Sequence, residues 1–555
     1  MTETLDYFRV SSLNLGKHCV LNTRPETTVR LLFHAAEHFS DRIFIEETDA
    51  SLSFADVKRH CLRIAAGLRA DGFEPGDRAA IWAPNLSEWV IAAFGIHCAG
   101  GQLVTLNTRY KGEEAAAILN DSGANTLFVV GEFLGVDYPA LLREIELPNL
   151  QRRIVLRGRT DANTVSWEAV LERGDQWLAT HGVAAIEDVA LAVAGDDISD
   201  IMFTSGTTGR AKGVLTNHQQ NVEAFRLFAD LLGLEPQDRY LIINPFFHSF
   251  GFKAGLLACL IAGCTVLPEP VFDVDAILAR IDRDAVTVMP GPPTIFQSIL
   301  AHPNRHQYTL ASLTKCTTGA AVIPTELIVA MRDELKIKTI ITAYGLSESS
   351  GLATMCRQGD TPEIIASSSG RAIPGVEVRC IDPEGNPVNT GEQGEIVIRG
   401  FNVMQGYLDN PEATAEAIDH HGWLHTGDIG RMDAAGNLTI TDRLKDMYIS
   451  GGFNCYPAEI ESHLLRHPEI IQCAVIGQPD VRMGEVGCAF VVRRAGAEIS
   501  ESELHAWARG AMANFKVPRT LIFVDALPLN ASGKVVKPTL RQWAQSYAQE
   551  RQEIV

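Results

Sequence analysis

The chain has 555 residues, of which 46% are hydrophobic and 21% are charged, enough apolar material for two or more folded units. Its formal net charge of −20 disfavours general attraction to nucleic acid or to anionic membranes. The eleven cysteines include no C-x-x-C pair, which favours reduced thiols over a disulfide framework or a zinc ribbon.

The two ends and the most apolar stretch carry no targeting or membrane signal. Residues 1–6 contain two acids and lack the basic and then apolar order of a signal peptide. The stretch 90–105 is shorter than a membrane span, and residues 552–555 are not a peroxisomal address. These features predict a cytoplasmic protein without a transmembrane segment.

From about residue 27 to residue 300, helix-like segments alternate with short runs of valine, isoleucine and leucine. Residues 77–82 are a candidate buried strand, residues 87–99 a candidate amphipathic helix, and residues 102–106 the next strand. Alternation of this kind is typical of parallel sheets covered by helices, so the predicted fold class is α/β.

Phosphate-binding character is concentrated in residues 201–213, where an apolar strand runs into glycines and hydroxyl residues followed by Lys212. Glycines let backbone N–H groups turn toward an anion, hydroxyls add donors, and lysine adds a positive charge. A P-loop of the NTPase kind would need a helix directly after the lysine, whereas residues 213–216 favour another strand. The loop is therefore expected to join two strands and to cradle a polyphosphate.

Four further segments combine glycine or small residues with chemically useful side chains. They are 244–251, aromatic and apolar around His248; 318–321, Thr-Gly-Ala-Ala; 344–348, Tyr-Gly-Leu-Ser-Glu; and 422–428, Gly-Trp-Leu-His-Thr-Gly-Asp. Segment 244–251 by itself favours a core segment with a satisfied histidine over a functional site. His421 and His425 have the spacing of a helical metal pair, but Gly422 between them argues against a helix and so against metal binding.

The second half of the chain changes in texture. Residues 375–398 alternate strand-like runs with a turn at 382–385, which predicts a small β-rich subdomain. A domain boundary is expected near 442–445, giving an N-terminal domain of residues 1–442 and a C-terminal domain of residues 443–555.

The C-terminal domain is expected to be a compact α+β unit. Pro457 opens a helix with Ile460, Leu464 and Leu465 on one face, before Pro468. A second helix begins at Ser500, with Glu503 completing a capping box, and buries Leu504, Trp507, Ala508 and Ala511. Near the end, residues 527–535 place Lys534 on a Ser/Gly loop.

Taken together and in this order, these motifs resemble the adenylate-forming superfamily, which comprises acyl-CoA synthetases, peptide-synthetase adenylation domains and beetle luciferases. The resemblance covers roughly residues 30–540, and the segment 442–452 is most similar to CoA ligases. Arg210-Ala211 stands where proline before the lysine is commoner, which leaves the phosphate donors intact.

The resemblance implies roles for individual residues. For the nucleotide it implies the loop residues Thr204, Ser205, Gly206, Thr207, Thr208, Gly209 and Lys212, the small residues Gly319, Ala320, Ala321 and Gly345, adenine stacking by Tyr344, ribose binding by Asp428, and support from Arg443. For catalysis it implies Lys534, Lys212, Glu348 and His248, with Thr207 and Glu348 holding Mg²⁺ and His248 or its aromatic neighbours gating the acyl channel. For CoA it implies a hinge at Lys445, about which a mobile C-terminal domain turns Gly451 and Gly452 toward the site.

The function implied is an ATP-dependent carboxylic acid–CoA ligase that forms an acyl-adenylate, with ATP, Mg²⁺ and coenzyme A as cofactors or co-substrates. The apolar lining expected from segments 246–248, 317–321 and 345–349 favours a fatty or alicyclic acid. The run 442–457 is similar to ligases that activate ring-bearing propanoates in bacterial steroid degradation, and medium- to long-chain fatty acid ligases are nearly as similar, so the resemblance implies one of these two substrate classes. An enzyme that loads a carrier protein, an aryl-acid–CoA ligase, a luciferase-like oxygenase and an inactive nucleotide-binding scaffold are the alternatives. The sequence leaves the oligomeric state open, a homodimer included.

Overall fold

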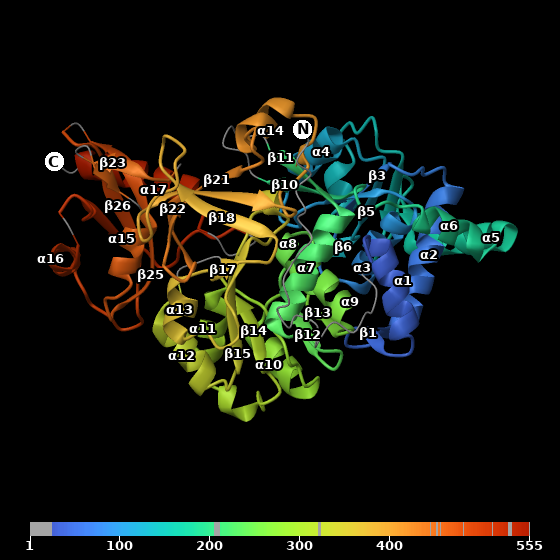
Figure 1. The fold of residues 1–555 in the computed structure, drawn as a ribbon, viewed down its shortest axis with the longest axis horizontal. Helices are drawn as coiled ribbons and strands as arrows, with labels where there is room; N and C mark the ends of the chain where they lie inside the picture. Colours follow the sequence, from blue (N-terminus) through green and yellow to red (C-terminus); the bar gives the residue numbers. More distant parts are fainter. Residues whose placement is uncertain are drawn as a thin grey trace, which may run out of the picture.

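The computed structural model describes residues 25–553 apart from residues 205–210, 320–322, 444–445, 451–452, 456, 481, 513 and 531–534. The molecule is elongated: the N-terminal helices and sheets form one end, and the C-terminal residues from about 446 onward form the other (Figure 1). A small antiparallel sheet lies between them.

The first sheet of the N-terminal part carries the phosphate loop. Its order is β20-β11-β10-β4-β3-β5-β8-β9, and the strands from β10 to β9 pair in parallel, whereas β11 is antiparallel to both β10 and β20. The strands are β3 (Arg78–Trp82), β4 (Gln102–Thr105), β5 (Thr126–Val129), β8 (Arg152–Val155), β9 (Val165–Ser166), β10 (Ile198–Thr204), β11 (Lys212–Asn217) and β20 (Gly406–Tyr407). The strands expected at 77–82 and 102–106 are confirmed.

A second sheet faces the first across a layer of helices. Two four-stranded paths, β2-β1-β13-β12 and β14-β15-β16-β17, are joined by parallel bridges through Val288. The strands are β1 (Ile43–Glu46), β2 (Ser51–Ser53), β12 (Arg239–Ile242), β13 (Thr265–Pro268), β14 (Lys315–Thr318), β15 (Thr339–Tyr344), β16 (Thr354–Met355) and β17 (Arg371–Ala372). A separate hairpin pairs β6 (Glu132–Phe133) with β7 (Val136–Asp137).

Helices fill the layer between the sheets and cover their outer faces. They are α1 (Thr28–His38), α2 (Phe54–Ala70), α3 (Ser87–Cys98), α4 (Gly112–Ser122), α5 (Trp167–His181), α6 (Val183–Leu191), α7 (His218–Leu232), α8 (Ser249–Gly251), the π-helix η2 (Phe252–Leu257), α9 (Ala258–Ala262), α10 (Val274–Arg283), α11 (Pro293–Ala301), α12 (Thr325–Asp333) and α13 (Pro362–Ser367). Short 3₁₀ turns are η1 (Pro139–Leu142), η3 (Arg305–Gln307) and η4 (Ser347–Ser349).

Helix α3 departs from the prediction of an amphipathic helix at 87–99. Every residue from Trp89 to Cys98 is buried, so the helix has no polar face. It contacts β3 and β4 of the first sheet, while the Trp89 ring lies 5.4 Å from Phe246, which follows β12 of the second sheet. A helix covered on all sides is hydrophobic all round, and that position explains why this prediction was wrong.

The predicted β-rich subdomain is confirmed as an antiparallel sheet with the order β18-β19-β21-β22. Its strands are β18 (Val376–Ile381), β19 (Gly394–Gly400), β21 (Leu424–Met432) and β22 (Leu438–Arg443), and α14 (Pro411–Ala417) packs beside β20 and β21. The predicted turn is present, because Gly385 N donates to Asp382 O at 3.0 Å.

The C-terminal residues form an α+β unit with hydrophobic cores of its own, built from Tyr448 onward. Its sheet has the order β24-β23-β26-β25, and β27 pairs with β26. The elements are β23 (Tyr448–Ser450), β24 (Phe453–Cys455), α15 (Pro457–Leu464), β25 (Ile470–Asp480), β26 (Gly484–Arg493), α16 (Glu501–Ala511), β27 (Thr520–Phe523) and α17 (Lys537–Glu553). The boundary at 442/443 stays a prediction, since residues 444–445 lie outside the described residues.

Both helices predicted in this unit are present. Pro457 opens α15, in which Ile460 and Leu464 are buried. The helix ends at Leu464, before Pro468. The Ser500–Glu503 capping box opens α16, which buries Leu504 and Ala508 and leaves Trp507 and Ala511 half-buried.

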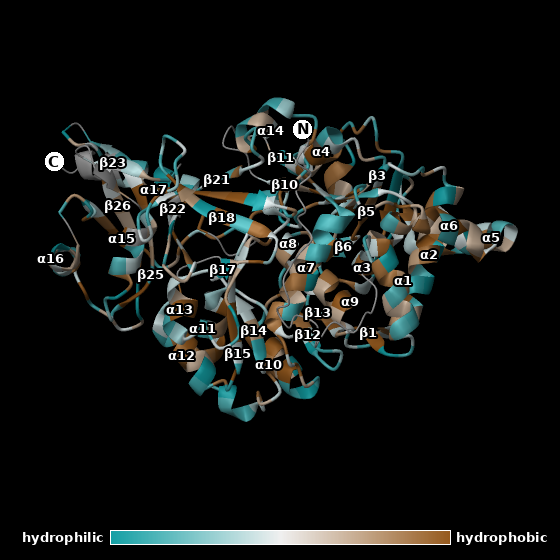
Figure 2. Ribbon diagram, viewed as in Figure 1, coloured by the Kyte–Doolittle hydropathy of each residue, from teal (hydrophilic) through white to brown (hydrophobic). Residues whose placement is uncertain are grey.

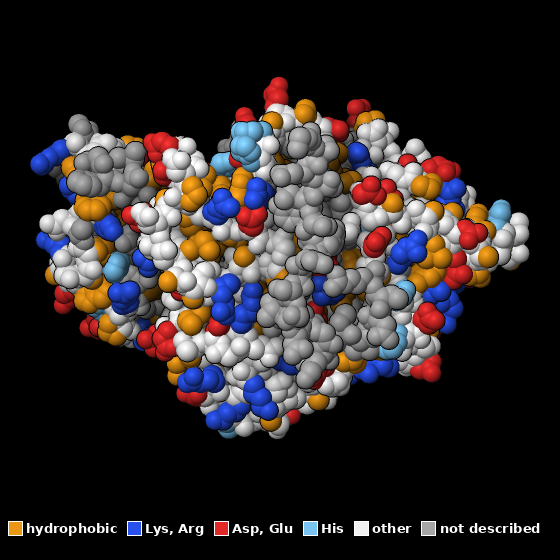
Figure 3. All heavy atoms as spheres, in the orientation of Figure 1, with side chains coloured by type: hydrophobic (Ala, Val, Ile, Leu, Met, Phe, Trp, Pro, Cys, Tyr) orange, Lys and Arg blue, Asp and Glu red, His pale blue; other side chains and the backbone are white. Residues whose placement is uncertain are grey.

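The distribution of hydropathy and charge over the fold is that of an ordinary globular protein (Figure 2, Figure 3), as the composition indicates. Hydrophobic residues gather in the strands and on α3, while outer helices such as α1 and α12 show both hydrophilic and hydrophobic turns (Figure 2). On the face drawn in Figure 3, acidic and basic side chains are interspersed among the described residues rather than separated into one-sign fields. Among the described helices, none has the length and hydropathy needed to cross a bilayer.

Candidate active site

The strands β10 and β11 form an antiparallel hairpin, in which Thr204 at the end of β10 lies opposite Lys212 at the start of β11. This confirms that the glycine-rich loop joins two strands. The loop itself, residues 205–210, lies outside the described residues, but the two residues that flank it are placed. The hairpin therefore fixes the two ends of the predicted phosphate loop.

The second piece of the site is the turn that follows β15. A Cβ at Gly345 would come within 2.4 Å of the backbone of Gly351 and Leu352, so only glycine fits there. The turn closes through two residues with left-handed backbones, Ser350 (φ 55°) and Gly351 (φ 93°). This tight reversal places Glu348, on η4, beside the end of β10.

Four side chains meet here in a group that we call the phosphate corner: Thr204, Lys212, Glu348 and Tyr407. Glu348 Oε1 accepts hydrogen bonds from Thr204 Oγ1 at 3.3 Å and from the Tyr407 hydroxyl at 3.0 Å. Lys212 Nζ lies 4.9 Å from the centre of the Tyr407 ring, within cation–π range. Burial and the Glu348 charge raise the pKa of Tyr407, so this phenol stays a donor.

The segment 402–408 ties the phosphate corner together through its backbone. Met404 N donates to Glu348 O at 2.9 Å, while Leu408 N donates to Gly213 O at 2.7 Å on the hairpin. Sequence reasoning missed Tyr407, because an aromatic residue in a short strand is ordinarily part of a core. No motif spacing marks Tyr407, and only the pairing of β20 with β11 brings it to the site.

The nucleoside corner is the pair Tyr344 and Asp428. The Tyr344 hydroxyl donates to Asp428 Oδ2 at 2.7 Å, and Asp428 is 3% exposed. Thr426 Oγ1 accepts from the Asp428 backbone N at 3.1 Å and donates to Ile396 O, which orients the end of the turn. In the β21–β22 ladder, Asp428 lies opposite Arg443, so the residues predicted to hold ribose and nucleotide are neighbours in the backbone.

The histidines near Asp428 do not form a metal pair. His425 lies on β21, and its Nδ1 is 3.0 Å from Glu395 Oε2, whereas His421 is exposed in the preceding turn. Among the described residues no cluster of three or more His, Cys, Asp or Glu side chains has the geometry to hold a metal ion. His421 and His425 therefore lie in a turn and on a strand and not on one helix, as Gly422 indicated.

His248 lies in the segment between β12 and α8. Its Nδ1 accepts from Phe250 N at 3.2 Å, while Phe246 is fully buried against Trp89. Gly251 allows the chain to fold back, because a Cβ there would come within 2.1 Å of Pro245 O. His248 is half-buried, and its gating role stays a prediction.

Among the remaining predicted site residues, the structure describes Gly319 and leaves the others outside its described part. Gly319 follows β14 and is half-buried, and among the described residues the nearest atom to a Cβ added there would be Ala343 O at 3.6 Å. Residues outside the described part of the chain are Ser205, Gly206, Thr207, Thr208, Gly209, Ala320, Ala321, Lys445, Gly451, Gly452 and Lys534.

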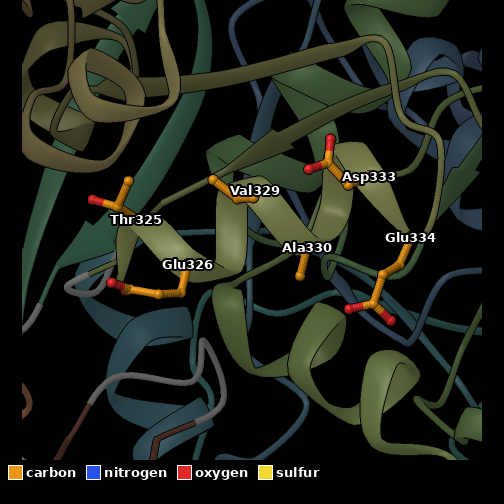
Figure 4. A pocket seen from close by; sticks show the side chains of 6 residues that line it. All are labelled: Thr325, Glu326, Val329, Ala330, Asp333 and Glu334. Carbon is orange, nitrogen blue, oxygen red and sulfur yellow. The ribbon is translucent and has the colours of Figure 1, made fainter.

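An open hollow along α12 is a different kind of place. It is lined by Thr325, Glu326, Val329, Ala330, Asp333 and Glu334, all from one helix and its end (Figure 4). Three of these six side chains are carboxylates, which would repel a polyphosphate. The hollow is therefore no candidate for the nucleotide.

Comparison with known families identifies the class. Residues 32–408 match the family described as AMP-binding enzyme, and residues 459–534 match the AMP-binding enzyme C-terminal domain. The chain belongs to the AMP-binding enzyme family, and the expectation of an adenylate-forming enzyme is confirmed.

Individual relatives narrow the class. The chain is 47% identical over 524 residues to a 3-(7a-methyl-1,5-dioxo-octahydro-inden-4-yl)propanoyl:CoA ligase of Rhodococcus jostii (strain RHA1), covering 94% of this chain and 99% of that protein. A protein of the same name from Mycobacterium tuberculosis is 48% identical over 525 residues, with the same coverage. A feruloyl-CoA synthase from Amycolatopsis is 36% identical and covers 89% of this chain and 94% of that protein.

Solved structures agree. The anthranilate CoA ligase AuaEII in complex with anthranoyl-AMP matches with a TM-score of 0.82 at 28% identity, covering 94% of this chain and 98% of that one. The chain is an AMP-forming acid–thiol ligase, which joins a carboxylic acid to CoA at the expense of ATP by way of an acyl-adenylate.

Proposed function

We propose that the acid activated by this ligase is a hydrophobic, ring-bearing propanoate of the steroid-derived kind. The observation that carries this proposal is that sequence identity to two ring-bearing propanoate ligases is higher than to the other CoA ligases compared. Two ligases named for a fused-ring dioxo propanoyl group are 47% and 48% identical, against 36% for feruloyl-CoA synthase and 33% for the human medium-chain acyl-CoA ligase. All four comparisons cover 89% or more of this chain, so the difference does not arise from partial matches.

The phosphate corner supports the roles proposed for Lys212 and Glu348. Adenylation must bring a carboxylate and a triphosphate together, and its barrier falls when fixed charges and dipoles face the charge that moves toward pyrophosphate. Lys212 supplies a cation at the mouth of the phosphate loop. Thr204 and Tyr407 hold the Glu348 carboxylate in one orientation before substrate arrives.

The same corner fits a magnesium ion. Glu348 and Thr204 present a carboxylate and a hydroxyl close together, and oxygen donors of this kind suit a hard divalent cation. In this proposal Glu348 and Thr207 would hold Mg²⁺, which when bound neutralises part of the triphosphate charge. Thr204 orients the carboxylate for that purpose.

The nucleoside corner supports ribose binding by Asp428. Its carboxylate is buried and already oriented by the Tyr344 hydroxyl, so little ordering is needed when a sugar diol donates to it. Gly345 keeps the turn beside it free of a side chain. Stacking of Tyr344 on adenine and support from Arg443 complete the proposed pocket.

The reaction then follows in two steps. An oxygen of the substrate carboxylate attacks the α-phosphorus, the bond to pyrophosphate breaks, and Lys534 offsets the repulsion between the two anions. The CoA thiol next attacks the adenylate carbonyl and AMP leaves. We propose that the C-terminal domain rotates about Lys445 between the two steps. This rotation would bring Gly451 and Gly452 to the path of the CoA thiol.

The setting proposed for the enzyme is the cytoplasm, where ATP and CoA are supplied. The ten described cysteines are all buried and none of them forms a disulfide, which supports a reducing environment. Buried thiols of this kind act as small hydrophobic residues.

An aryl acid is the second candidate substrate, because feruloyl-CoA synthase and the anthranilate ligase are both relatives of this chain. The discriminating experiment is an acid panel. The purified protein is incubated with ATP, MgCl₂ and CoA, together with a fused-ring dioxo propanoate, octanoate, dodecanoate, ferulate or anthranilate, and AMP and thioester are measured.

We expect kcat/KM for the fused-ring propanoate to exceed the others by roughly 100-fold, a discrimination that pocket shape can reach. A higher kcat/KM for ferulate or dodecanoate would overturn the substrate proposal. If thioester forms only when a carrier protein replaces CoA, the carrier-loading alternative holds instead.

A further inference from the structure

A lysine that the reaction scheme above does not use contacts the two strands that flank the phosphate loop. Lys253 lies in the π-helix η2, and its side chain is 1% exposed. Its Nζ is 2.9 Å from Asp200 Oδ1, whose side chain is fully buried, and donates to Thr216 Oγ1 at 2.9 Å. This is a buried ion pair completed by a hydroxyl.

The two partners of Lys253 belong to the hairpin that carries the loop. Asp200 on β10 and Thr216 on β11 are direct opposite partners in its ladder. Farther along the same ladder, Thr204 lies opposite Lys212 at the mouth of the loop. Lys253 therefore contacts both strands at the Asp200–Thr216 pair. This pair lies four residues along each strand from the Thr204–Lys212 pair, whose side chains belong to the phosphate corner.

The lysine also connects this hairpin to the segment around His248. Only a short helical turn, α8, separates His248 from η2, and the chain there is folded tightly enough that Gly251 admits no Cβ. π-Helical turns distort the regular helix and occur often at functional sites. The Lys253 ammonium thus joins the proposed acyl gate to the phosphate hairpin through its contacts with Asp200 and Thr216.

The Asp200 carboxylate has further partners. Its Oδ2 accepts from Asn221 Nδ2 at 2.6 Å and from Ser199 Oγ at 2.7 Å, which hold it even without the lysine. Ser199 O in turn accepts from His97 Nε2 at 3.0 Å. The hairpin is therefore anchored by polar bonds to α3 and α7 as well as to η2.

Stability alone does not account for this arrangement. Removing charges from water is unfavourable, and burial lowers the pKa of Lys253 while the Asp200 charge opposes that change. A hydrophobic pair of similar volume is often as stable as a buried ion pair. The ion pair with Asp200 on one strand and the hydrogen bond to Thr216 on the other give what a hydrophobic pair lacks, a fixed register between hairpin and helix.

We propose that Lys253 is a positioning residue for adenylation, which holds the phosphate-loop hairpin in place relative to the His248 segment. This inference rests on the proposed roles of the phosphate loop and the His248 segment. It predicts that loss of the Lys253 bridge impairs the step that needs ATP phosphates aligned with the acid. It also predicts that the thioester step, which begins after pyrophosphate has left, is spared.

The experiment compares Lys253→Met with a matched control, Lys315→Met. Lys315 forms a largely buried ion pair with Asp238 at 2.6 Å, at the start of β14 in the second sheet and away from the phosphate hairpin. Two reactions are measured for each variant: acid-dependent ATP–pyrophosphate exchange, and thioester formation from chemically prepared acyl-adenylate and CoA.

We expect Lys253→Met to lower kcat for exchange by about 100-fold, the effect of a misplacement near 1 Å. Its rate from prepared adenylate should stay within about threefold of wild type, because that misplacement acts on the ATP phosphates. Lys315→Met should change the two reactions equally. If Lys253→Met lowers both reactions to the same degree, or neither, the proposal is overturned.

A double variant separates positioning from folding. Lys253→Met leaves a buried Asp200 charge, and the added change Asp200→Asn removes it, so thermal stability should return toward wild type. Exchange should stay low, because neither strand is bonded to η2. Recovery of exchange together with stability would make Lys253 structural only. If the wild type shows no exchange with any acid, the proposed function fails first, and that result is distinct from all of these.

Discussion

The phosphate corner and the nucleoside corner hold a carboxylate in opposite ways. Glu348 is half-buried and is approached by hydroxyls from two other segments, with a lysine nearby. Asp428 is almost fully buried and is set by the Tyr344 phenol beside it. The first arrangement suits charge that moves during reaction, whereas the second suits the neutral sugar that we propose it binds. The difference predicts that replacing Glu348 and replacing Asp428 change different kinetic parameters.

The largest effect is expected at the phosphate corner. Glu348→Gln keeps the shape and removes the charge, so kcat for pyrophosphate exchange should fall by about 10²–10³, the usual loss for one transition-state group. The Mg²⁺ concentration giving half-maximal rate should rise in the same titration. An unchanged kcat with only a higher KM for ATP would contradict the proposed difference between the phosphate corner and the nucleoside corner.

The next effect is expected at the nucleoside corner and on a different parameter. Asp428→Asn should raise KM for ATP by roughly 30-fold, about 2 kcal/mol for a buried, charge-assisted hydrogen bond. Its kcat at saturating ATP should stay within about threefold of wild type. Initial rates over a range of ATP concentrations give both values, and a fall confined to kcat would contradict the receptor role.

A smaller pair of changes sharpens the comparison, because each removes one hydroxyl. Tyr407→Phe should lower kcat for exchange by about tenfold, since it frees Glu348 while keeping the ring beside Lys212. Tyr344→Phe should instead raise KM for ATP by a similar factor. The two variants serve as controls for each other in one assay, and identical kinetic changes would refute the assignment.

The last test concerns the fold beneath the phosphate corner, where α3 contacts β10. The variant His97→Gln should leave the rate at pH 7 unchanged. His97 Nε2 donates to Ser199 O, so its Nδ1 accepts from Thr28 Oγ1, which accepts from His218 Nδ1. Burial lowers the pKa of His97 to about 4. The unfolded chain therefore binds the extra proton between about pH 6.5 and 4, and stability rises with pH across that window.

The contribution of His97 is fully present above pH 6.5 and is lost as the pH falls toward 4, by about 3 kcal/mol in total. The urea midpoint should thus drop steeply from pH 6.5 to pH 5, and less steeply in His97→Gln. The exposed His421→Gln is the matched control and should follow wild type. An equal slope in all three proteins would exclude His97 as the source.

Local patterns in the sequence were enough for most elements. The strand before residue 205 and the strand after Lys212 follow from apolar runs around a glycine-rich loop, and both are present. The capping box at Ser500 likewise predicted α16. These signals succeed because turns and caps depend on residues close together in the chain.

Long-range contacts escaped the same reasoning. The stretch 87–99 is predicted to be amphipathic, and α3 is instead buried on every side, because the first sheet and the helices α1, α2 and α6 pack around it. Tyr407 lies 59 residues from Glu348, and Lys253 lies 53 residues from Asp200, so no local spacing links either pair. Only the ladder β20-β11-β10 and the helix η2 bring them together.

The sequence by itself determined the class of chemistry, because glycines, hydroxyls, a lysine and two carboxylates stand in family order and each carries its own reactivity. The tertiary structure decided how those groups are held: which hydroxyl orients Glu348, that Tyr344 bonds Asp428, and that a buried lysine bridges the phosphate hairpin. The physical reason is that reactivity belongs to residue types, whereas orientation comes from strands and helices that are distant in the chain and meet only when it folds.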